Sequence, residues 1–225
     1  MMYKNKKIIT AVLIAVMALI VMTYVERILQ PGYWIKSLIK VTVFAGSSIL
    51  YSIWNKGNFF ELIGLKKKRP SKKLIFCIVF AYAGIIILYL LLKNQIDLNG
   101  IKEKLLAKEG LNRNNFIFIF SYIILINSFL EESFFRGFLY QVFRKEGYEK
   151  AGAVFSALVF ALYHISIMDG WFNPAIMALG IGGLFLTGIF LQLVCRHEGS
   201  LIGSWLVHGS ANLAINTIAT IMILS

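Results

Sequence analysis

Seven long apolar stretches, separated by short polar segments, restrict the folds open to this sequence more than any other feature. They cover about residues 8–25, 37–54, 74–92, 116–140, 151–168, 175–195 and 201–224. A helix needs about 20 mostly apolar residues to cross the hydrocarbon core of a bilayer, and each stretch is close to that length. With 58% hydrophobic and only 15% charged residues, the chain does not have the composition of an ordinary soluble domain. The sequence therefore predicts an all-α, polytopic membrane helix bundle of about seven transmembrane helices.

The stretches follow one another without an internal repeat, a low-complexity tract or a soluble appendage, so we expect a single membrane domain over residues 1–225. Within it, N-terminal spans occupy residues 1–93, and the remaining spans occupy about 116–224. The second stretch is the weakest span, because Lys36 and Lys40 lie at its start. These lysines could snorkel to the interface, or the span could begin after them.

Basic residues cluster between the apolar stretches, most densely at residues 66–73. In a soluble protein the net charge of +12 would suggest nucleic-acid binding, but clusters between spans are typical of membrane topology instead. Threading seven spans from a cytoplasmic N-terminus places 15 of the 23 Lys and Arg residues inside and 8 outside. We therefore expect a multi-pass protein of the cell (plasma) membrane with a cytoplasmic N-terminus, the lipid bilayer as a partner, and no nucleic acid. The Lys-, Ile- and Asn-rich composition is compatible with a low-GC bacterium.

Two adjacent glutamates and an arginine lie deep in the fourth stretch, where each charge needs a partner or a task. Glu132 and Arg136 are four residues apart, so they share a helix face and suit an internal ion pair. Glu131 points about 100° away and has no cation close to it in sequence, which is the situation expected of a general base. An ion pair alone could be a buried clamp between helices, but two adjacent glutamates are harder to explain as clamps.

Two further helix faces pair residues at a spacing of four, namely Phe160 with His164 in the fifth stretch and His208 with Asn212 in the seventh. A single histidine in an apolar helix is more often a packing residue, and an asparagine can simply hydrogen-bond between helices. At a rise of about 1.5 Å per residue, however, Glu131, both histidines and Asn212 fall at a similar depth. The sequence therefore predicts one buried polar site between spans four, five and seven.

These motifs together resemble those of the CPBP family of intramembrane proteases, which includes the CAAX prenyl endopeptidases and bacteriocin-processing and immunity proteins. The motifs are Glu131-Glu132-x-x-x-Arg136, Phe160-x-x-x-His164 and His208-x-x-x-Asn212. The resemblance covers about residues 116–216 and includes the order and intervals of the motifs, and it implies a catalytic core at about 116–224. It implies an intramembrane endopeptidase that hydrolyses a peptide bond of a hydrophobic or lipidated protein or peptide substrate.

The same resemblance implies roles for four residues. Glu131 and His164 would activate a water molecule, and His208 and Asn212 would stabilise the developing oxyanion. The family has been treated both as metalloproteases and as glutamate-dependent enzymes, so Zn²⁺ remains an alternative, with Glu131, His164 and His208 as its ligands. The sequence has no HExxH motif, and a water held by Glu131 and His164 needs no ion. We therefore favour metal-free activation of water.

Supporting roles are implied for three other residues: Arg136 would hold Glu132, Glu132 would help to order the helix that presents Glu131, and Phe160 would pack beneath the histidine. Two other functions remain open at this point. One is a non-proteolytic membrane scaffold or bacteriocin self-immunity protein on the same fold. The other is a small transporter or proton relay, although the paired inverted halves of many transporters are not evident. A CAAX substrate is a prenylated protein, which most bacteria lack, so the family name does not identify the substrate.

Overall fold

The structure, a computed structural model, describes residues 2–66 and 69–224, and these residues form helices joined by short connections. Lys67 and Lys68 of the predicted basic cluster lie outside the described residues. Seven helices of the described part are long and apolar enough to cross a membrane: Lys6–Leu29, Tyr33–Trp54, Lys72–Leu92, Phe116–Lys145, Glu149–Ile167, Pro174–Glu198 and Leu201–Leu224. The predicted fold class, a polytopic helical bundle with seven spans, is confirmed.

Several spans are composite helices in which α-helical parts alternate with π-helical segments. The first three spans consist of α1 (Met2–Tyr24) with η1 (Val25–Leu29), then α2 (Tyr33–Val41), η2 (Thr42–Gly46) and α3 (Ser47–Trp54), then α5 (Lys72–Leu92). The fourth span consists of α7 (Phe116–Tyr122), η3 (Ile123–Asn127), α8 (Ser128–Glu132), η4 (Ser133–Leu139) and α9 (Tyr140–Lys145). The last three spans are α10 (Glu149–Ile167), α11 (Pro174–Glu198) and α12 (Leu201–Leu224). Short helices α4 (Phe59–Leu62) and α6 (Leu98–Lys108) lie in the connections on either side of α5.

Side chains at the helix ends explain where many of these helices begin and end. Ser71 accepts a hydrogen bond from the backbone N–H of Leu74 and so caps α5, and Asp97 caps α6 in the same way. Asn173 caps α11, which has a proline at its first position and ends at Gly199 with a φ of 63°. These caps satisfy backbone groups that would otherwise be left without partners at the ends of the spans.

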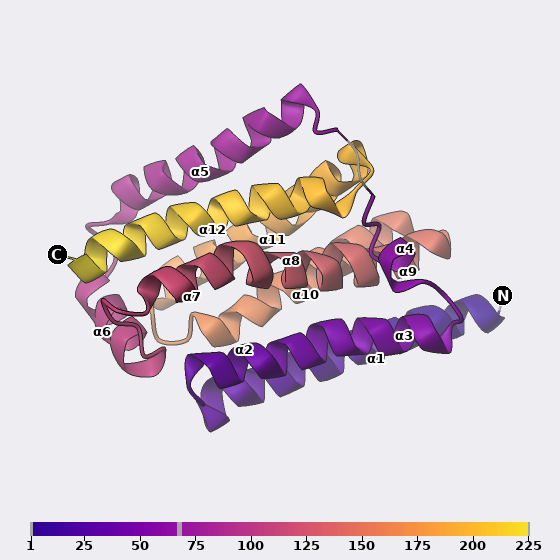
Figure 1. Ribbon diagram of the computed structural model, residues 1–225, viewed down its shortest axis with the longest axis horizontal. Helices are drawn as coiled ribbons and strands as arrows, with labels where there is room; N and C mark the ends of the chain where they lie inside the picture. Colours follow the sequence, from indigo (N-terminus) through magenta and orange to yellow (C-terminus); the bar gives the residue numbers. More distant parts are fainter. Residues whose placement is uncertain (1, 67–68, 225) are drawn as a thin grey trace.

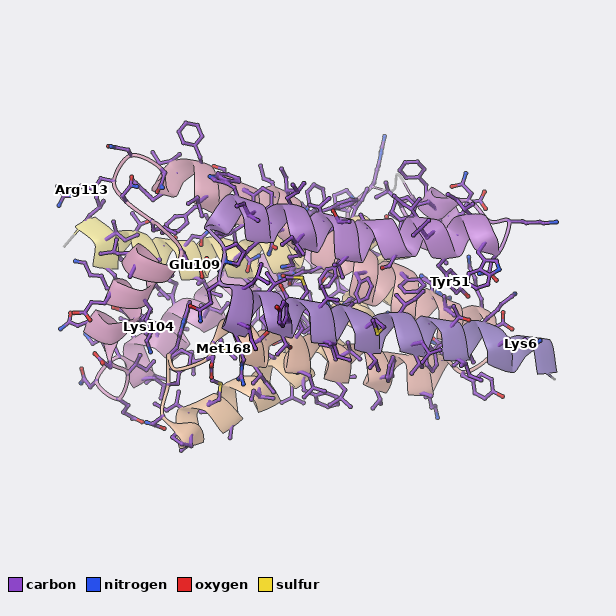
Figure 2. All side chains as sticks on the ribbon, turned by 90° about the horizontal axis from the view of Figure 1, so that it is seen from below. Lys6, Tyr51, Lys104, Glu109, Arg113 and Met168 are labelled. Atoms are coloured by element: carbon purple, nitrogen blue, oxygen red, sulfur yellow. The ribbon has the colours of Figure 1, made fainter. Side chains whose placement is uncertain are left out.

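The spans lie side by side with alternating direction, so the two termini are at opposite ends of the molecule (Figure 1). The first two spans form one edge of the bundle and α5 forms the opposite edge, where it packs along α12 (Figure 1). Figure 2 shows Lys6 and Tyr51 toward one end, and Lys104, Glu109 and Arg113 toward the other. The fourth span lies in the interior, and nearly all residues from Ser128 to Phe143 are buried.

Aromatic rings form the core where the second, fourth and fifth spans meet. The rings that pack here belong to Phe44, Phe134, Phe135, Phe138, Phe160 and Tyr163, and all are at most 2% exposed. The rings of Phe44 and Phe134 stack at a centroid distance of 4.5 Å. Large apolar side chains such as Phe76 and Leu91 of α5 are exposed on the outside, as expected of surfaces that face acyl chains. Closely packed aromatic rings therefore surround the part of the bundle where the second, fourth and fifth spans meet.

The beginning of the second span differs from the expectation. This span begins at Tyr33, and Lys36 and Lys40 neither snorkel to an interface nor precede the helix. They are 5% and 6% exposed, because the polar face of α2 is turned into the bundle while Trp34 and Leu38 face outward. Carboxylates on neighbouring elements receive both ammonium groups, which removes the need to reach water.

Candidate active site

The two glutamates lie on α8, a short α-helical segment with a π-helical segment on each side. A π-helical turn widens a helix locally, and such turns are frequent at functional sites. Here Glu131 is 2% exposed and Glu132 is 0% exposed, so both carboxylates point into the bundle although they are adjacent in sequence. Both are therefore available to residues of neighbouring helices.

The predicted pair of Glu132 and Arg136 is present, with 2.9 Å between Oε1 and Nη1. His208 of α12 joins it, since its Nδ1 lies 3.0 Å from the same oxygen. The guanidinium carbon of Arg136 lies 4.2 Å from the ring centroid of Phe160, a cation–π arrangement. The ring of Phe160 also packs against the imidazoles of His164 and His208, at centroid distances of 4.5 and 5.8 Å. Phe160 thus packs against Arg136 and both imidazoles, and it restrains the orientation of the two histidine rings.

Glu131 faces both histidines. Its Oε2 lies 3.6 Å from Nε2 of His208 and 3.9 Å from Nε2 of His164, and this buried oxygen accepts no hydrogen bond from any described side chain. These distances exceed a direct hydrogen bond but suit a water that contacts all three atoms. The predicted meeting of spans four, five and seven therefore occurs at Glu131 Oε2.

Hydrogen bonds at the other ring nitrogen determine what each histidine presents to Glu131. Nδ1 of His164 lies 2.7 Å from the backbone carbonyl oxygen of Phe160. A carbonyl oxygen can only accept, so this nitrogen donates, and Nε2 of the neutral ring is left as an acceptor. The same reasoning applies to His208, whose Nδ1 donates to the Glu132 carboxylate. In its neutral form, each imidazole therefore presents a proton-accepting nitrogen to the site.

Lys40 and Asn127 also belong to the site, and neither was among the predicted site residues. The Nζ atom of Lys40 binds Oε1 of Glu131, and Nδ2 of Asn127 donates to the same oxygen at 3.1 Å. The expectation that Glu131 has no cation holds only for its own span. Lys40 was missed because it lies 91 residues earlier in sequence. A signal was nevertheless present, because a lysine and a glutamate in two spans each lacked a partner on their own helix.

Asn212 is the predicted site residue that the structure does not bring to Glu131. Its side-chain amide donates to the backbone carbonyl of Ile123 at 3.3 Å, one turn of α12 away from His208. Asn216, one turn further, makes the same kind of bond to the carbonyl of Phe120. Both asparagines thus connect α12 to the fourth span, where Ile123 of η3 and Phe120 of α7 accept their hydrogen bonds.

The three residues suggested as metal ligands do not fit a metal ion as they are placed. Over residues 2–66 and 69–224, no group of three or more His, Cys, Asp or Glu side chains is arranged so that it could hold one. Glu131 already has an ammonium group on Oε1, and a lysine at this position would repel a divalent cation. The side chains present fit a water molecule better than a metal ion.

Comparison with models of protein families finds a match over residues 113–214, to the type II CAAX prenyl endopeptidase Rce1-like family. The matched residues nearly coincide with the segment on which the three motifs rest and include all of them. No curated protein and no solved structure matches the chain. The match agrees with the family indicated by the motifs: residues 113–214, the part of this multi-pass membrane protein that carries the site, are similar to the Rce1-like type II CAAX prenyl endopeptidases, which are proteases.

Proposed function

We propose that this protein is an intramembrane endopeptidase in which Glu131 and His164 activate a water molecule to hydrolyse a peptide bond. One observation carries the proposal, namely that Oε2 of Glu131 is buried, accepts no hydrogen bond from the described side chains and faces two imidazole Nε2 atoms at 3.6 and 3.9 Å. With both rings neutral, the carboxylate oxygen and the two imidazole nitrogens are three acceptors, which suits a molecule that has protons to give. The family match over residues 113–214 supports the same class of reaction.

In the proposed reaction, Glu131 Oε2 and His164 Nε2 accept hydrogen bonds from the water and orient its lone pair toward the substrate carbonyl carbon. The water oxygen forms a bond to this carbon while Glu131 takes one proton, and the carbonyl electrons move to the oxygen. As the tetrahedral intermediate collapses, the C–N bond breaks and the nitrogen leaves with the proton that Glu131 had taken, passed on through His208. The second water proton passes to His164, which releases it to solvent with the carboxylate product and so returns to its starting state. No metal ion takes part in these steps.

His208 and Asn212 are the proposed donors to the oxyanion. His208 can donate once its Nε2 has received the proton from Glu131, which lies 3.6 Å away. Asn212 carries two amide hydrogens and gives one to Ile123, which leaves the other for the substrate. Removal of one such donor typically slows a reaction about 10²- to 10³-fold. His208 would afterwards pass its proton to the leaving nitrogen.

The proposed substrate is a hydrophobic or lipidated peptide or protein. The site lies between apolar spans, so a substrate must bring its scissile bond into the bilayer or to its edge. The matched family is named for cleavage of prenylated CAAX proteins, which supports a lipid-modified or strongly apolar peptide as the class. A polar, water-soluble peptide would lose its hydration without compensation on entering such a site.

Peptidomes of membranes that contain wild-type protein or the variant Glu131→Gln test the proposal. The variant keeps the shape of the side chain but removes the proton-accepting carboxylate, so the product peptides should disappear while the protein stays folded and abundant. Glu103→Gln is the matched control, because Glu103 is exposed on α6, far in sequence from the motifs. We expect this control to release the wild-type products. Equal products from Glu131→Gln and wild type would refute the proposed chemistry.

A further inference from the structure

Lys40 contributes to the candidate site from outside the segment that matches the protease family. It lies on α2 in the second span, whereas the family match begins at residue 113. Its side chain is only 6% exposed although it carries a full positive charge. A lysine at such a place needs compensation, because burial of an unpaired charge is strongly unfavourable. The contacts that compensate it are those of the candidate active site.

The ammonium group is fixed by contacts with three different spans. It binds Oε1 of Glu131 and Oδ1 of Asn127 in the fourth span. It also lies 4.8 Å from the ring centroid of Tyr163 in the fifth span and 5.6 Å from that of Phe44, one turn along its own span. Asn127 closes the arrangement by donating to Oε1 of Glu131 at 3.1 Å. The position of the Lys40 ammonium group is thus defined by two hydrogen-bond acceptors and two aromatic rings rather than by one flexible ion pair.

The two adjacent carboxylates each receive a cation, but from different sources. Arg136, on the same helix as Glu132, pairs with Glu132, while Lys40 pairs with Glu131 from another span. Because Lys40 and Asn127 both bind Oε1, the other oxygen of Glu131 is directed to Nε2 of His164 and His208. Without Lys40, rotation of the carboxylate would exchange the two oxygens, and Glu131 would be a buried acid without a counter-charge.

We propose that Lys40 is a positioning residue of the active site, which holds Oε1 of Glu131 so that Oε2 faces the two imidazoles. This inference rests on the proposed protease function and deepens it, since it makes the second span part of the catalytic apparatus. Lys40 itself touches neither the reacting water nor the substrate in this scheme. Its effect is expected in the reactivity of Glu131 and not in substrate binding.

Infrared spectroscopy of the purified protein in proteoliposomes tests the pairing without any need for activity. The variant Lys40→Met should show a C=O stretching band of a protonated carboxyl group that wild type lacks, because the buried Glu131 would take up a proton once its counter-charge is removed. The band should vanish in Lys40→Met combined with Glu131→Gln, which assigns it to Glu131. Lys40→Arg, which keeps the charge, should not show it. Absence of the band in folded Lys40→Met would overturn the proposal.

Cleavage kinetics test the consequence for catalysis. Two quenched fluorogenic peptides serve as probes, one with a farnesylated C-terminal CAAX sequence and one an unmodified transmembrane segment. With the probe that wild type cleaves, Lys40→Met should lower kcat at least about tenfold with little change in KM, and Lys40→Arg should recover part of the loss. In a Glu131→Gln background the same change should have no further effect, because residues that act through one another are not additive.

Lys36→Met is the matched control, since Lys36 is equally buried, lies one turn earlier on α2, and pairs with Glu26 and Glu109 instead of Glu131. We expect it to lose stability but to keep the wild-type kcat. Loss of kcat in both lysine variants alike would show that Lys40 acts only by stabilising α2.

If Glu131→Gln still cleaves, the proposed function fails, whereas the infrared result decides the pairing independently. If Glu131→Gln is inactive but Lys40→Met is fully active, only the role of Lys40 fails.

Discussion

Glu132 and Arg136 illustrate at the scale of single residues how charges can be kept inside an apolar bundle. They are 0% and 1% exposed, and their ion pair is supported by His208 and by the ring of Phe160. Removal of one partner lowers the stability of the folded protein, because the remaining charge is still buried. Removal of both charges can leave the stability nearly unchanged. Single and double variants can therefore distinguish the stability that depends on the pairing from that of either residue alone.

We predict that Arg136→Met destabilises the folded protein by about 3–5 kcal/mol, because it leaves the Glu132 carboxylate buried without a counter-charge. Glu132→Gln together with Arg136→Met should recover much of this loss. Unfolding of the purified protein by sodium dodecyl sulfate in mixed micelles measures both effects. Arg144→Met serves as the control, because Arg144 is exposed at the end of α9 and should change stability by about 0.5 kcal/mol or less. If the double variant is no more stable than Arg136→Met, the pair is not the source of the effect.

The two carboxylates also show which contacts a sequence can reveal. The Glu132–Arg136 pair was predictable, because residues four apart on a helix are neighbours whatever the rest of the fold does. The partner of Glu131 was not, since contact between Lys40 and Glu131 depends on how the second and fourth spans pack. The same limit applies to Asn212, whose depth was predicted but whose hydrogen bond to Ile123 depends on the rotation of α12.

At the scale of helices, close packing of α10 against α11 positions the segment that carries His164. Gly188 of α11 makes this approach achievable, because a Cβ atom there would lie 2.8 Å from Cβ and 2.9 Å from Cα of Ala157 on α10. Small residues at such contacts are a general means of bringing membrane helices together. Ala157 lies one turn before Phe160, so displacement of α10 would be transmitted to the ring that packs against both histidines.

We predict that Gly188→Ala destabilises the protein by about 1–3 kcal/mol, since the added methyl group must push two backbones apart. Cleavage activity should fall as well, because α10 carries Phe160 and His164. Gly183→Ala is the control on the same helix: its Cβ would meet nothing within 4 Å, so the change should be neutral or slightly stabilising. Thermal unfolding in detergent, followed by tryptophan fluorescence, compares the two. Equal behaviour of the two variants would contradict the importance of this helix contact.

Helix positions were predicted well where hydrophobic length alone determines them, and less well where amphipathic character matters. The sixth and seventh stretches, expected at 175–195 and 201–224, lie within the spans Pro174–Glu198 and Leu201–Leu224. The second span was expected from residue 37 but begins at Tyr33, because ion pairs inside the bundle, rather than snorkelling or a later start, accommodate Lys36 and Lys40. The π-helical segments η3 and η4 beside the glutamates have no signal in the apolar pattern, since both helix types keep the same side chains within the span.

At the scale of the whole molecule, the structure changes which charges count toward orientation. Arg136, Lys36 and Lys40 are buried in ion pairs, so they do not report on the side of the membrane. Removing Arg136 from the 15 basic residues of one side, and the two lysines from the 8 of the other, leaves 14 and 6. The asymmetry is stronger than in the sequence-based count, and it supports a cytoplasmic location for the end of the bundle that carries Lys6 (Figure 2).

Labelling of single cysteines in intact cells tests this orientation. We predict that Arg113→Cys reacts with a membrane-impermeant maleimide added outside, whereas Lys145→Cys reacts only after the cells are opened. Both side chains are exposed, and they lie at opposite ends of the fourth span, so a bilayer around the bundle must separate them. The native Cys77 and Cys195 are first replaced by alanine, and this cysteine-free chain gives the background. Labelling of Lys145→Cys alone in intact cells would reverse the orientation and place the basic connection between α3 and α5 outside.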